Sequence, residues 1–324
     1  MTQQSDPNHR TRDEVRRLSV ELGLKLNLNR ILVPLNGDLE AEQILPYASM
    51  LADWFSGEIT LFHCLPATHP ARGARPGQVQ YPDAPHDRGT ALASAYLEEI
   101  VSRLSPLGVK SRWGIATGRA ATMITSRSVT SSSGIIAVGT TARSRYHRLF
   151  STGLLDDLWK LTAVPLLIVN PDSEAAKEVL PQAPTKVIVP SGNGNVDSAI
   201  SMANAIAGAS RSEVTIALSG SSGDEAESEQ LNAFSRAGIK AEIARADLKP
   251  TEHLHSIQAA NPGSWIVIES KMRSGFVRSL FGSNGDKCVR DASGPVLVVP
   301  NQEVSHRKVL STHGGMRNLS SAEQ

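Results

Sequence analysis

The chain has 324 residues, enough for two domains at roughly 100–200 residues each. Its formal net charge of +1 argues against an overall nucleic-acid partner, and no apolar run approaches the roughly 20 residues of a membrane span. The two cysteines, Cys64 and Cys288, lie in different halves, and the polar N-terminus has no apolar signal core, so we expect a soluble cytoplasmic protein.

The first predicted element is a short amphipathic helix. Val15, Leu18 and Leu22 recur at helical spacing between Thr11 and about Leu22. Such a helix can pack on the first domain or on a partner. The segment that follows, residues 30–35, is apolar after its first residue, as in a parallel strand that is covered on both faces.

Helices and strands then alternate through the first half. The expected helices cover about residues 44–55, 92–104, 118–129 and 154–161, and the further strands cover 58–62, 109–113, 134–138 and 165–169. Residues 66–90 are rich in Pro, Gly, Ala and charge, which predicts a mobile loop. The alternation predicts a doubly wound α/β sheet with right-handed crossovers and helices on both faces.

The second half repeats this order. Lys186-Val-Ile-Val-Pro190 mirrors Arg30-Ile-Leu-Val-Pro34, and the later elements are expected at 199–207, 213–216, 223–237, 239–243, 251–260, 264–268 and 294–299. A unit that occurs twice indicates a duplication. We therefore divide the chain into an N-terminal extension (1–28), a first domain (29–172), a linker (173–185), a second domain (186–301) and a polar tail (302–324).

In both halves the fourth strand is followed by a basic loop, a short helix and a closing strand. The exit of a strand and the start of the next helix face one point, where backbone N–H groups can hold an anion. Ligands of doubly wound sheets lie beyond the carboxyl ends of the strands, where the strand order switches. The pattern therefore predicts a ligand site at this place in each half.

Each half resembles the universal stress protein domain. The matching pieces are ILVPLNG and KVIVPSG in the opening strands, GTTARSRYHRLFSTG and ESKMRSGFVRSLFGS in the loops, and VPLLIVNP and GPVLVVPN in the closing strands. The resemblance covers about residues 30–171 and 186–301. It implies two adenine nucleotide alpha hydrolase-like domains in tandem, which form a pseudo-dimer through the closing strands Leu166–Val169 and Val296–Val299.

ATP-binding members of that family carry G-x2-G-x9-G-[S/T] in the loop, and an Asp after the first strand that reaches the ribose. Carried over, the resemblance implies a first-half site made of Asn36, Gly139, Thr140, Ala142, Arg143, Thr152 and Gly153. Here Asn36 replaces the Asp, Ala142 replaces the second glycine, and the last pair reads Thr152-Gly153. Arg143 and the basic residues after it either contact phosphates or form a solvated loop.

The second-half site departs further from the pattern. Its positions are Glu269, Met272, Gly282 and Ser283, of which only the last two match. Glu269 would place a carboxylate where phosphates should lie, and Met272 adds bulk where the backbone must approach the ligand. We therefore expect this site to be degenerate and not to bind ATP as the family does.

Three weaker patterns are better explained by local structure than by a catalytic or metal site. Residues 191–198, SGNGNVDS, are similar to the SGGxDS loop of ATP pyrophosphatases but two residues longer, and they also fit an ordinary turn with a helix cap. The neighbours His63 and Cys64 point to opposite faces of a strand and predict packing, not a metal site. His253 and His255 are expected on a polar helix surface.

The leading hypothesis is a non-enzymatic stress-response or regulatory protein with ATP, and Mg²⁺ with it, in the first half. Alternatives are an ATP-binding switch that uses the first site alone, a pyrophosphatase-type enzyme that uses Ser191, Asp197 and Ser198, and a scaffold. The scaffold would bind protein partners through residues 66–90 or the N-terminal helix. Self-association of two chains stays open, and no nucleic-acid partner is expected.

Overall fold

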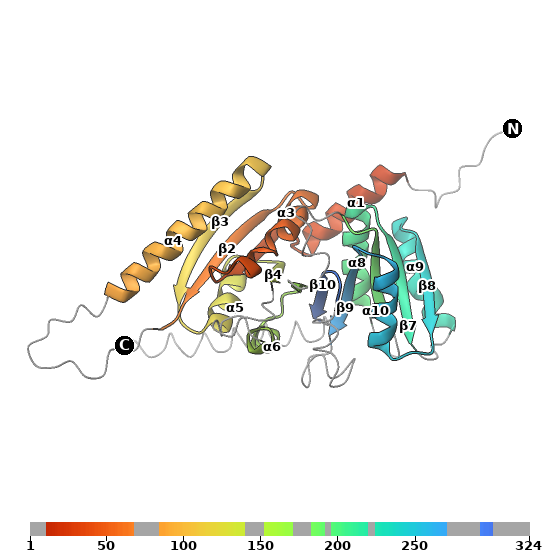
Figure 1. The fold of residues 1–324 in the computed structure, drawn as a ribbon. Coiled ribbons are helices and arrows are strands. Elements are labelled where there is room, and N and C mark those ends of the chain that lie inside the picture. Colours follow the sequence, from red (N-terminus) through yellow and green to blue (C-terminus); the bar gives the residue numbers. More distant parts are fainter. Residues whose placement is uncertain are drawn as a thin grey trace, which may run out of the picture.

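The computed structural model describes residues 11–67, 84–139, 152–170, 183–191, 196–219, 224–270 and 292–300. The strands of this part of the chain form one ten-stranded sheet that runs through the whole molecule (Figure 1). Helices cover both of its faces. The predicted α/β class and the parallel doubly wound sheet are thereby confirmed.

The first half contributes five parallel strands in the order β3-β2-β1-β4-β5. They are β1 (Arg30–Leu35), β2 (Glu58–Leu65), β3 (Lys110–Thr117), β4 (Ile135–Gly139) and β5 (Leu166–Val169). The inner strands β1, β4 and β5 are buried almost throughout because helices cover both of their faces. Strand β3 lies at the sheet edge and is correspondingly more exposed.

The second half continues the sheet with the same strand order reversed, as β10-β9-β6-β7-β8. Its strands are β6 (Lys186–Ser191), β7 (Glu213–Ser219), β8 (Ala241–Ala246), β9 (Trp265–Ser270) and β10 (Val296–Pro300). All neighbours within this half are parallel. The repeated order agrees with the duplication that the sequence predicts.

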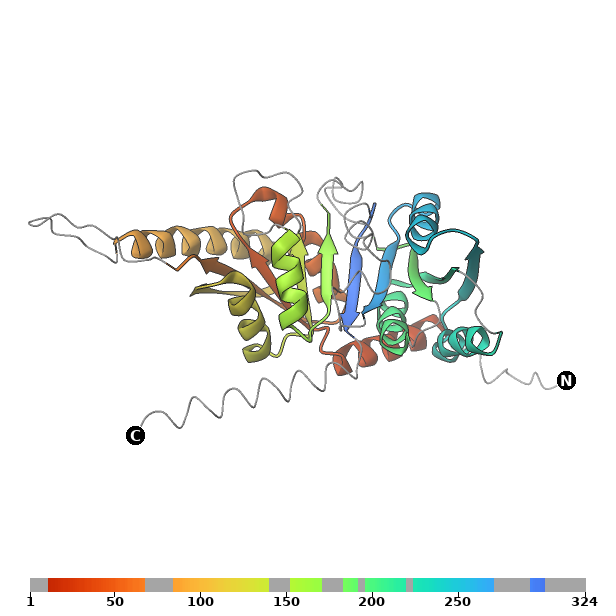
Figure 2. The same cartoon turned by 90° about the horizontal axis from the view of Figure 1, so that it is seen from below.

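The two halves join through their closing strands, as expected. Strand β10 pairs with β5 in antiparallel fashion, with Leu297 opposite Leu167. Figure 2 shows the two arrows side by side and pointing in opposite directions. The strands of the two halves therefore end at opposite margins of the common sheet.

The helices divide between the two faces of the sheet. They are α1 (Arg12–Lys25), α2 (Leu39–Glu42), α3 (Leu45–Trp54), α4 (Ala84–Leu104), α5 (Ala120–Thr130), α6 (Thr152–Leu161), α8 (Asp197–Ser210), α9 (Asp224–Ala237) and α10 (Pro250–Ala260). One core holds side chains of α3, α4, α8 and α9, and the other holds side chains of α5, α6 and α10. No helix in the described ranges is long and apolar enough to cross a membrane.

The N-terminal helix α1 links the two halves. It packs against α8 and α9 of the second half, while Gly23 near its end lies against the ring of Phe55 in the first half. A Cβ at position 23 would come within 2.2 Å of that ring. The helix thus packs within the chain and mainly on the second half (Figures 1 and 2). This differs from both options considered from the sequence, which were the first domain and a partner.

An aromatic cluster lies where the halves meet. The ring of Trp265 in β9 lies 5.7 Å from that of Trp54 and 6.0 Å from that of Tyr47, both of which come from α3 in the first half. Trp265 is among the largest fully buried side chains of the described chain. Tilted aromatic pairs at this spacing stabilise a core beyond the area that they bury.

Some sequence predictions were wrong in detail. Residues 84–90 belong to α4, so the predicted loop at 66–90 is too long at its end, and residues 68–83 lie outside the described ranges. Leu92 is 67% exposed and does not belong to the core face of α4. His253 is buried, not at the surface, because it lies on the face of α10 that packs on β6 and β7.

Candidate functional site

The strand order switches between β1 and β4 in the first half. From β1 the chain proceeds to β2 and β3 on one side of β1, and then crosses to β4 and β5 on its other side. Ile31 lies opposite Ile135 and Leu32 opposite Ile136, and continuing this register brings Leu35 next to Gly139. Asn36 and Gly139, two of the predicted site residues, therefore meet at the place where doubly wound sheets bind ligands.

Gly139 also has a packing role that the sequence did not reveal. A Cβ on this residue would lie 2.8 Å from the carbonyl oxygen of Ala41 and 3.1 Å from its Cα. Real Cβ atoms do not approach backbone so closely, so glycine is required for α2 to lie against the end of β4. The residue was predicted to admit a phosphate, but its described neighbour is the protein backbone.

Asn36 organises the turn between β1 and α2. Its Oδ1 accepts a hydrogen bond from the backbone N–H of Asp38 at 3.0 Å, and the carboxylate of Asp38 accepts one from the N–H of Glu40 at 3.4 Å. Asp38 is thus the N-cap of α2. The side-chain amide nitrogen of Asn36 has no hydrogen bond within the described residues and can still donate to a ligand oxygen.

A small cavity lies beside this turn. Its volume is about 10 Å³, and it is lined by Pro34, Leu35, Asn36, Phe62, Cys64, Ala120 and Ile124. That volume corresponds to about one water molecule. A nucleotide at this switch must therefore lie outside the cavity, beyond the strand ends.

The remaining first-site residues are only partly described. Thr140, Ala142 and Arg143 lie outside the described ranges, as do the basic residues that follow them. Thr152 and Gly153 are the first two residues of α6. Because α6 connects the parallel strands β4 and β5, its N-terminus lies at the same margin of the sheet as Gly139.

In the second half the order switches between β6 and β9, and this place is occupied by a carboxylate. Glu269 in β9 is only 4% exposed. Its Oε2 accepts hydrogen bonds from the backbone N–H groups of Ser198, at 2.9 Å, and Ala199, at 3.2 Å. These are N–H groups of the first turn of α8, where the helix dipole favours a negative charge.

Glu269 and Gly139 hold the same position in their halves. Each is near the carboxyl end of the strand that flanks the opening strand, and each contacts the helical segment that follows the opening strand. In the first half a glycine lets that segment approach as bare backbone. In the second half a glutamate fills the gap and supplies the anion itself. The other three residues of the second site, Met272, Gly282 and Ser283, lie outside the described ranges.

The pyrophosphatase-like segment is built around the same carboxylate. Ser191 is buried at the end of β6, and its hydroxyl has no hydrogen-bond partner in the described structure. Asp197 is the exposed first residue of α8, and the N–H of Ser198 donates to Glu269. A phosphate at this helix start would compete with a buried carboxylate for the same donors.

Burial holds three titratable side chains beside the first-half site in their uncharged forms. Burial raises the pKa of the Cys64 thiol to about 12, so this cysteine is not a ready nucleophile near neutral pH. Burial is also the largest cause that lowers the pKa of His63 and raises the pKa of Tyr96, whose hydroxyl faces Glu42. Among the residues that the structure describes, no three His, Cys, Asp or Glu side chains form a group that could hold a metal ion.

Sequence reasoning missed the contribution of α2 and of Asp38. The sequence does indicate this turn, because Asn36 and Asp38 lie on either side of a glycine directly after a buried strand. That arrangement is typical of a turn capped by side chains. The contact of Ala41 with Gly139 had no such signal, because it depends on how two elements meet in space.

Comparison with known proteins agrees with this architecture. Residues 187–300 match the model of the universal stress protein family. The comparison with curated proteins gave no significant match.

Solved structures resemble the chain over most of its length. A universal stress protein from Archaeoglobus fulgidus DSM 4304 aligns with a TM-score of 0.68 and 16% identity, covering 84% of this chain and 98% of that one. A protein from Pseudomonas aeruginosa UCBPP-PA14 that is provisionally named a universal stress protein gives 0.61 at 16% identity, covering 89% and 99%. A functionally unknown protein from Pseudomonas aeruginosa PAO1 gives 0.60 at 16% identity, covering 90% and 99%.

At this level of identity the structures establish the fold and not the activity. The second half of the chain, residues 187–300, matches the universal stress protein family, and the chain as a whole has the α/β fold of the structures that it resembles.

Proposed function

We propose that the chain is a tandem of two universal stress protein-like domains that acts as a non-enzymatic stress-response or regulatory protein. In this proposal an adenine nucleotide binds in the first half only. The family match of residues 187–300 supports the assignment of the second domain. The mirrored strand order and the closing-strand pairing support the same assignment for the first.

The observation that carries the proposal is the hydrogen bonding of Glu269. Its buried carboxylate takes the N–H groups of Ser198 and Ala199, so the anion position of the second half is filled by the protein itself. A nucleotide phosphate there would bring a second negative charge into a poorly hydrated place, which costs binding free energy. The second half therefore does not fit ATP.

The first half keeps the features that a nucleotide needs. It has glycine in place of Glu269, and Asn36 presents a side-chain N–H₂ at the switch. Asn36 would donate to a ribose hydroxyl, and the N-terminus of α6 would face the phosphates and their Mg²⁺. The nucleotide would act here as a regulatory ligand, whose binding shifts the population of a bound form.

We propose that the chain has no enzymatic activity because the ionisable side chains near the first-half site already have structural roles or stay uncharged. Asp38 serves as a helix cap, and burial keeps the Cys64 thiol protonated at neutral pH. The pyrophosphatase alternative depends on a helix start that is already bonded to Glu269. The version of the scaffold hypothesis that uses the N-terminal helix loses one face of that helix to packing, because α1 packs on α8, and keeps only the exposed face for a partner.

Photoaffinity labelling with 8-azido-ATP and Mg²⁺, followed by peptide mapping, tests the location. We expect competitor-sensitive label on peptides of residues 29–172 and none on residues 186–301. Label in the second half, or no label that excess ATP displaces, would contradict the proposal. Gly139 variants are unsuitable for this test, since any side chain there collides with Ala41 and disturbs the fold.

A turnover assay on the same preparation tests the non-enzymatic part. The chain is expected to release neither phosphate nor AMP from ATP above the background of a mock purification. Release that disappears in Asp197→Ala would instead favour the pyrophosphatase-type enzyme, since Asp197 belongs to that segment alone.

A further inference from the structure

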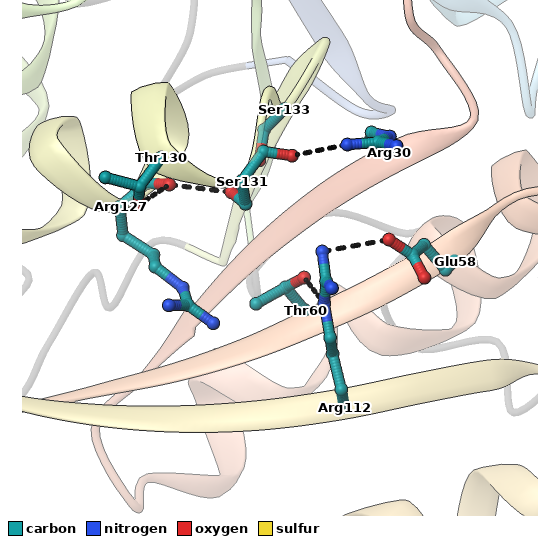
Figure 3. Close-up of polar contacts among 8 residues, drawn as sticks. All are labelled: Arg30, Glu58, Thr60, Arg112, Arg127, Thr130, Ser131 and Ser133. Carbon is teal, nitrogen blue, oxygen red and sulfur yellow. Dashed lines mark hydrogen bonds and ion pairs between the residues drawn. The ribbon is translucent and has the colours of Figure 1, made fainter.

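A group of basic side chains lies on one face of the first-half sheet. Arg30 begins β1, Arg112 lies in β3 and Arg127 in α5, and together with Thr60 we call them the basic cluster (Figure 3). The basic cluster lies on the sheet face that α5 covers. Arg30 is separated from Asn36 by the length of β1, about 20 Å at roughly 3.3 Å per residue.

Two of the three arginines are held in place by polar contacts. The Nε of Arg112 donates to the hydroxyl of Thr60 at 3.1 Å, and its guanidinium pairs with Glu58 at 2.9 Å. Arg30 donates to the carbonyl oxygen of Ser131, just after α5, at 3.2 Å. The Arg112 side chain is nevertheless 48% exposed, so donors of the group still face solvent.

Arg127 differs because no acid or carbonyl group in the described part of the chain accepts a hydrogen bond from its side chain. Its guanidinium lies 5.9 Å from the centre of the Phe62 ring, in cation–π contact, and it also lies over Gly114. Its Nε is buried and has no hydrogen-bond partner among the described residues. A buried donor without an acceptor costs free energy, and a bound oxyanion would remove that cost.

The second half offers an internal comparison. The positions that correspond by strand and helix place are Lys186 for Arg30, Thr215 for Thr60, Glu242 for Arg112 and Ile257 for Arg127. They line an open groove of about 310 Å³ between α10 and the sheet. There Lys186 pairs with Glu242 at 2.7 Å, and Thr215 donates to the same carboxylate at 3.2 Å.

The two sets of corresponding residues differ in their net charge. On the first-half face four cations, Lys110, Arg30, Arg112 and Arg127, stand against the single carboxylate of Glu58, and α5 carries no acid. On the second-half face Lys186 and Lys240 are matched one to one by Glu242 and Glu213. The same architecture is therefore neutral in one half and has an excess of three positive charges in the other.

We infer that the basic cluster binds a phosphate-type oxyanion, either free or as the phosphoryl group of a small molecule. Planar guanidinium groups from β3 and α5 suit such an anion because each offers paired N–H donors. Arg112 and Arg127 lie above neighbouring positions of the same strand face, since Arg112 and Gly114 are two residues apart in β3. The anion would bridge these two side chains on the solvent-exposed side of Arg112.

The test is a titration of the full chain with inorganic phosphate near pH 7.5, followed by NMR of the arginine Nε–H signals. We expect a saturable shift of the Arg127 signal, with an affinity that falls as salt is raised. Arg127→Ile, followed through the Arg112 Nε–H signal, and Arg112→Glu, followed through the Arg127 signal, introduce the second-half residues and should each weaken binding at least about tenfold, as expected for loss of charge-assisted hydrogen bonds. Arg127→Lys should give an intermediate loss, because it keeps the charge without the fork.

One control separates this site from others. Glu242→Gln alters the corresponding groove of the second half and should leave the shift of the Arg127 signal unchanged. Phosphate binding that persists in Arg127→Ile, or no saturable shift in the wild-type chain, would overturn the inference. Far-UV circular dichroism confirms that each variant is folded.

Discussion

At the scale of single residues, one position decides how the two halves differ. Gly139 and Glu269 both meet the segment after the opening strand, but glycine leaves bare backbone and glutamate adds a bonded carboxylate. Both were singled out from the sequence, where Glu269 was expected to oppose phosphates. The sequence could not show that the carboxylate would cap α8, because the two segments are about 70 residues apart along the chain.

The cap formed by Glu269 should be measurable in stability. Glu269→Ala leaves the N–H groups of Ser198 and Ala199 buried without their acceptor, which we expect to lower the free energy of unfolding by about 1–3 kcal/mol. Glu252→Ala, at an exposed position in α10, is the control and should change it by less than about 0.5 kcal/mol. Urea denaturation followed by circular dichroism measures both. Equal stability of the two variants would show that the cap contributes nothing.

Two histidines predict how stability depends on pH. Burial lowers the pKa of His63 and of His253 from the ordinary value of 6.5. The unfolded chain therefore binds more protons than the folded chain as the pH falls, so stability is lost as the pH falls below about 6.5. We expect the urea midpoint to be lower near pH 5.5 than near pH 7.5. The double variant His63→Gln, His253→Gln should show a smaller difference, and an unchanged difference would count against these two groups.

At the scale of elements, α8 shows what hydrophobic periodicity can and cannot predict. The pattern predicted an element over residues 199–207, whereas α8 spans Asp197–Ser210 and nearly every one of its residues is buried. A helix that is apolar all round is covered on all sides. The small residues of α8 thus signalled a second covering element, but nothing in the sequence showed that this element is α1 from the other end of the chain.

The contact of α1 with α8 gives a matched pair of substitutions. Leu22 packs against the shared core, whereas Leu18 on the same helix is 39% exposed. Leu22→Ala should therefore lower the free energy of unfolding by about 1–2 kcal/mol, because apolar area is lost. Leu18→Ala should have a clearly smaller effect. Thermal unfolding followed by circular dichroism compares them, and a larger loss for Leu18→Ala would refute the described packing of α1.

At the scale of the whole molecule, one continuous sheet joins the halves. The β5–β10 pairing, the aromatic contacts of Trp265 with α3 and the packing of α1 on α8 all cross the boundary between them. The class of fold and the pairing strands were predictable because apolar runs indicate buried strands directly, and the mirrored strand order agrees with the predicted repeat. The bridging contacts were not, because they depend on the relative placement of segments far apart in sequence.

The antiparallel junction also separates the two switch points. The strands of one half end where those of the other begin, so the first-half site and the site filled by Glu269 lie at opposite margins of the sheet. Two ligands could not contact each other across this distance.

The most direct measurement of the central claim is the stoichiometry of ATP binding. Isothermal titration of the intact chain with ATP and Mg²⁺ should give one nucleotide per chain, and Glu269→Ala should leave the first-half affinity unchanged. Two equivalent nucleotides per wild-type chain would contradict the account, because the second would have to displace the buried carboxylate of Glu269 from α8. The absence of any binding would equally contradict it, since the first half would then hold no nucleotide either.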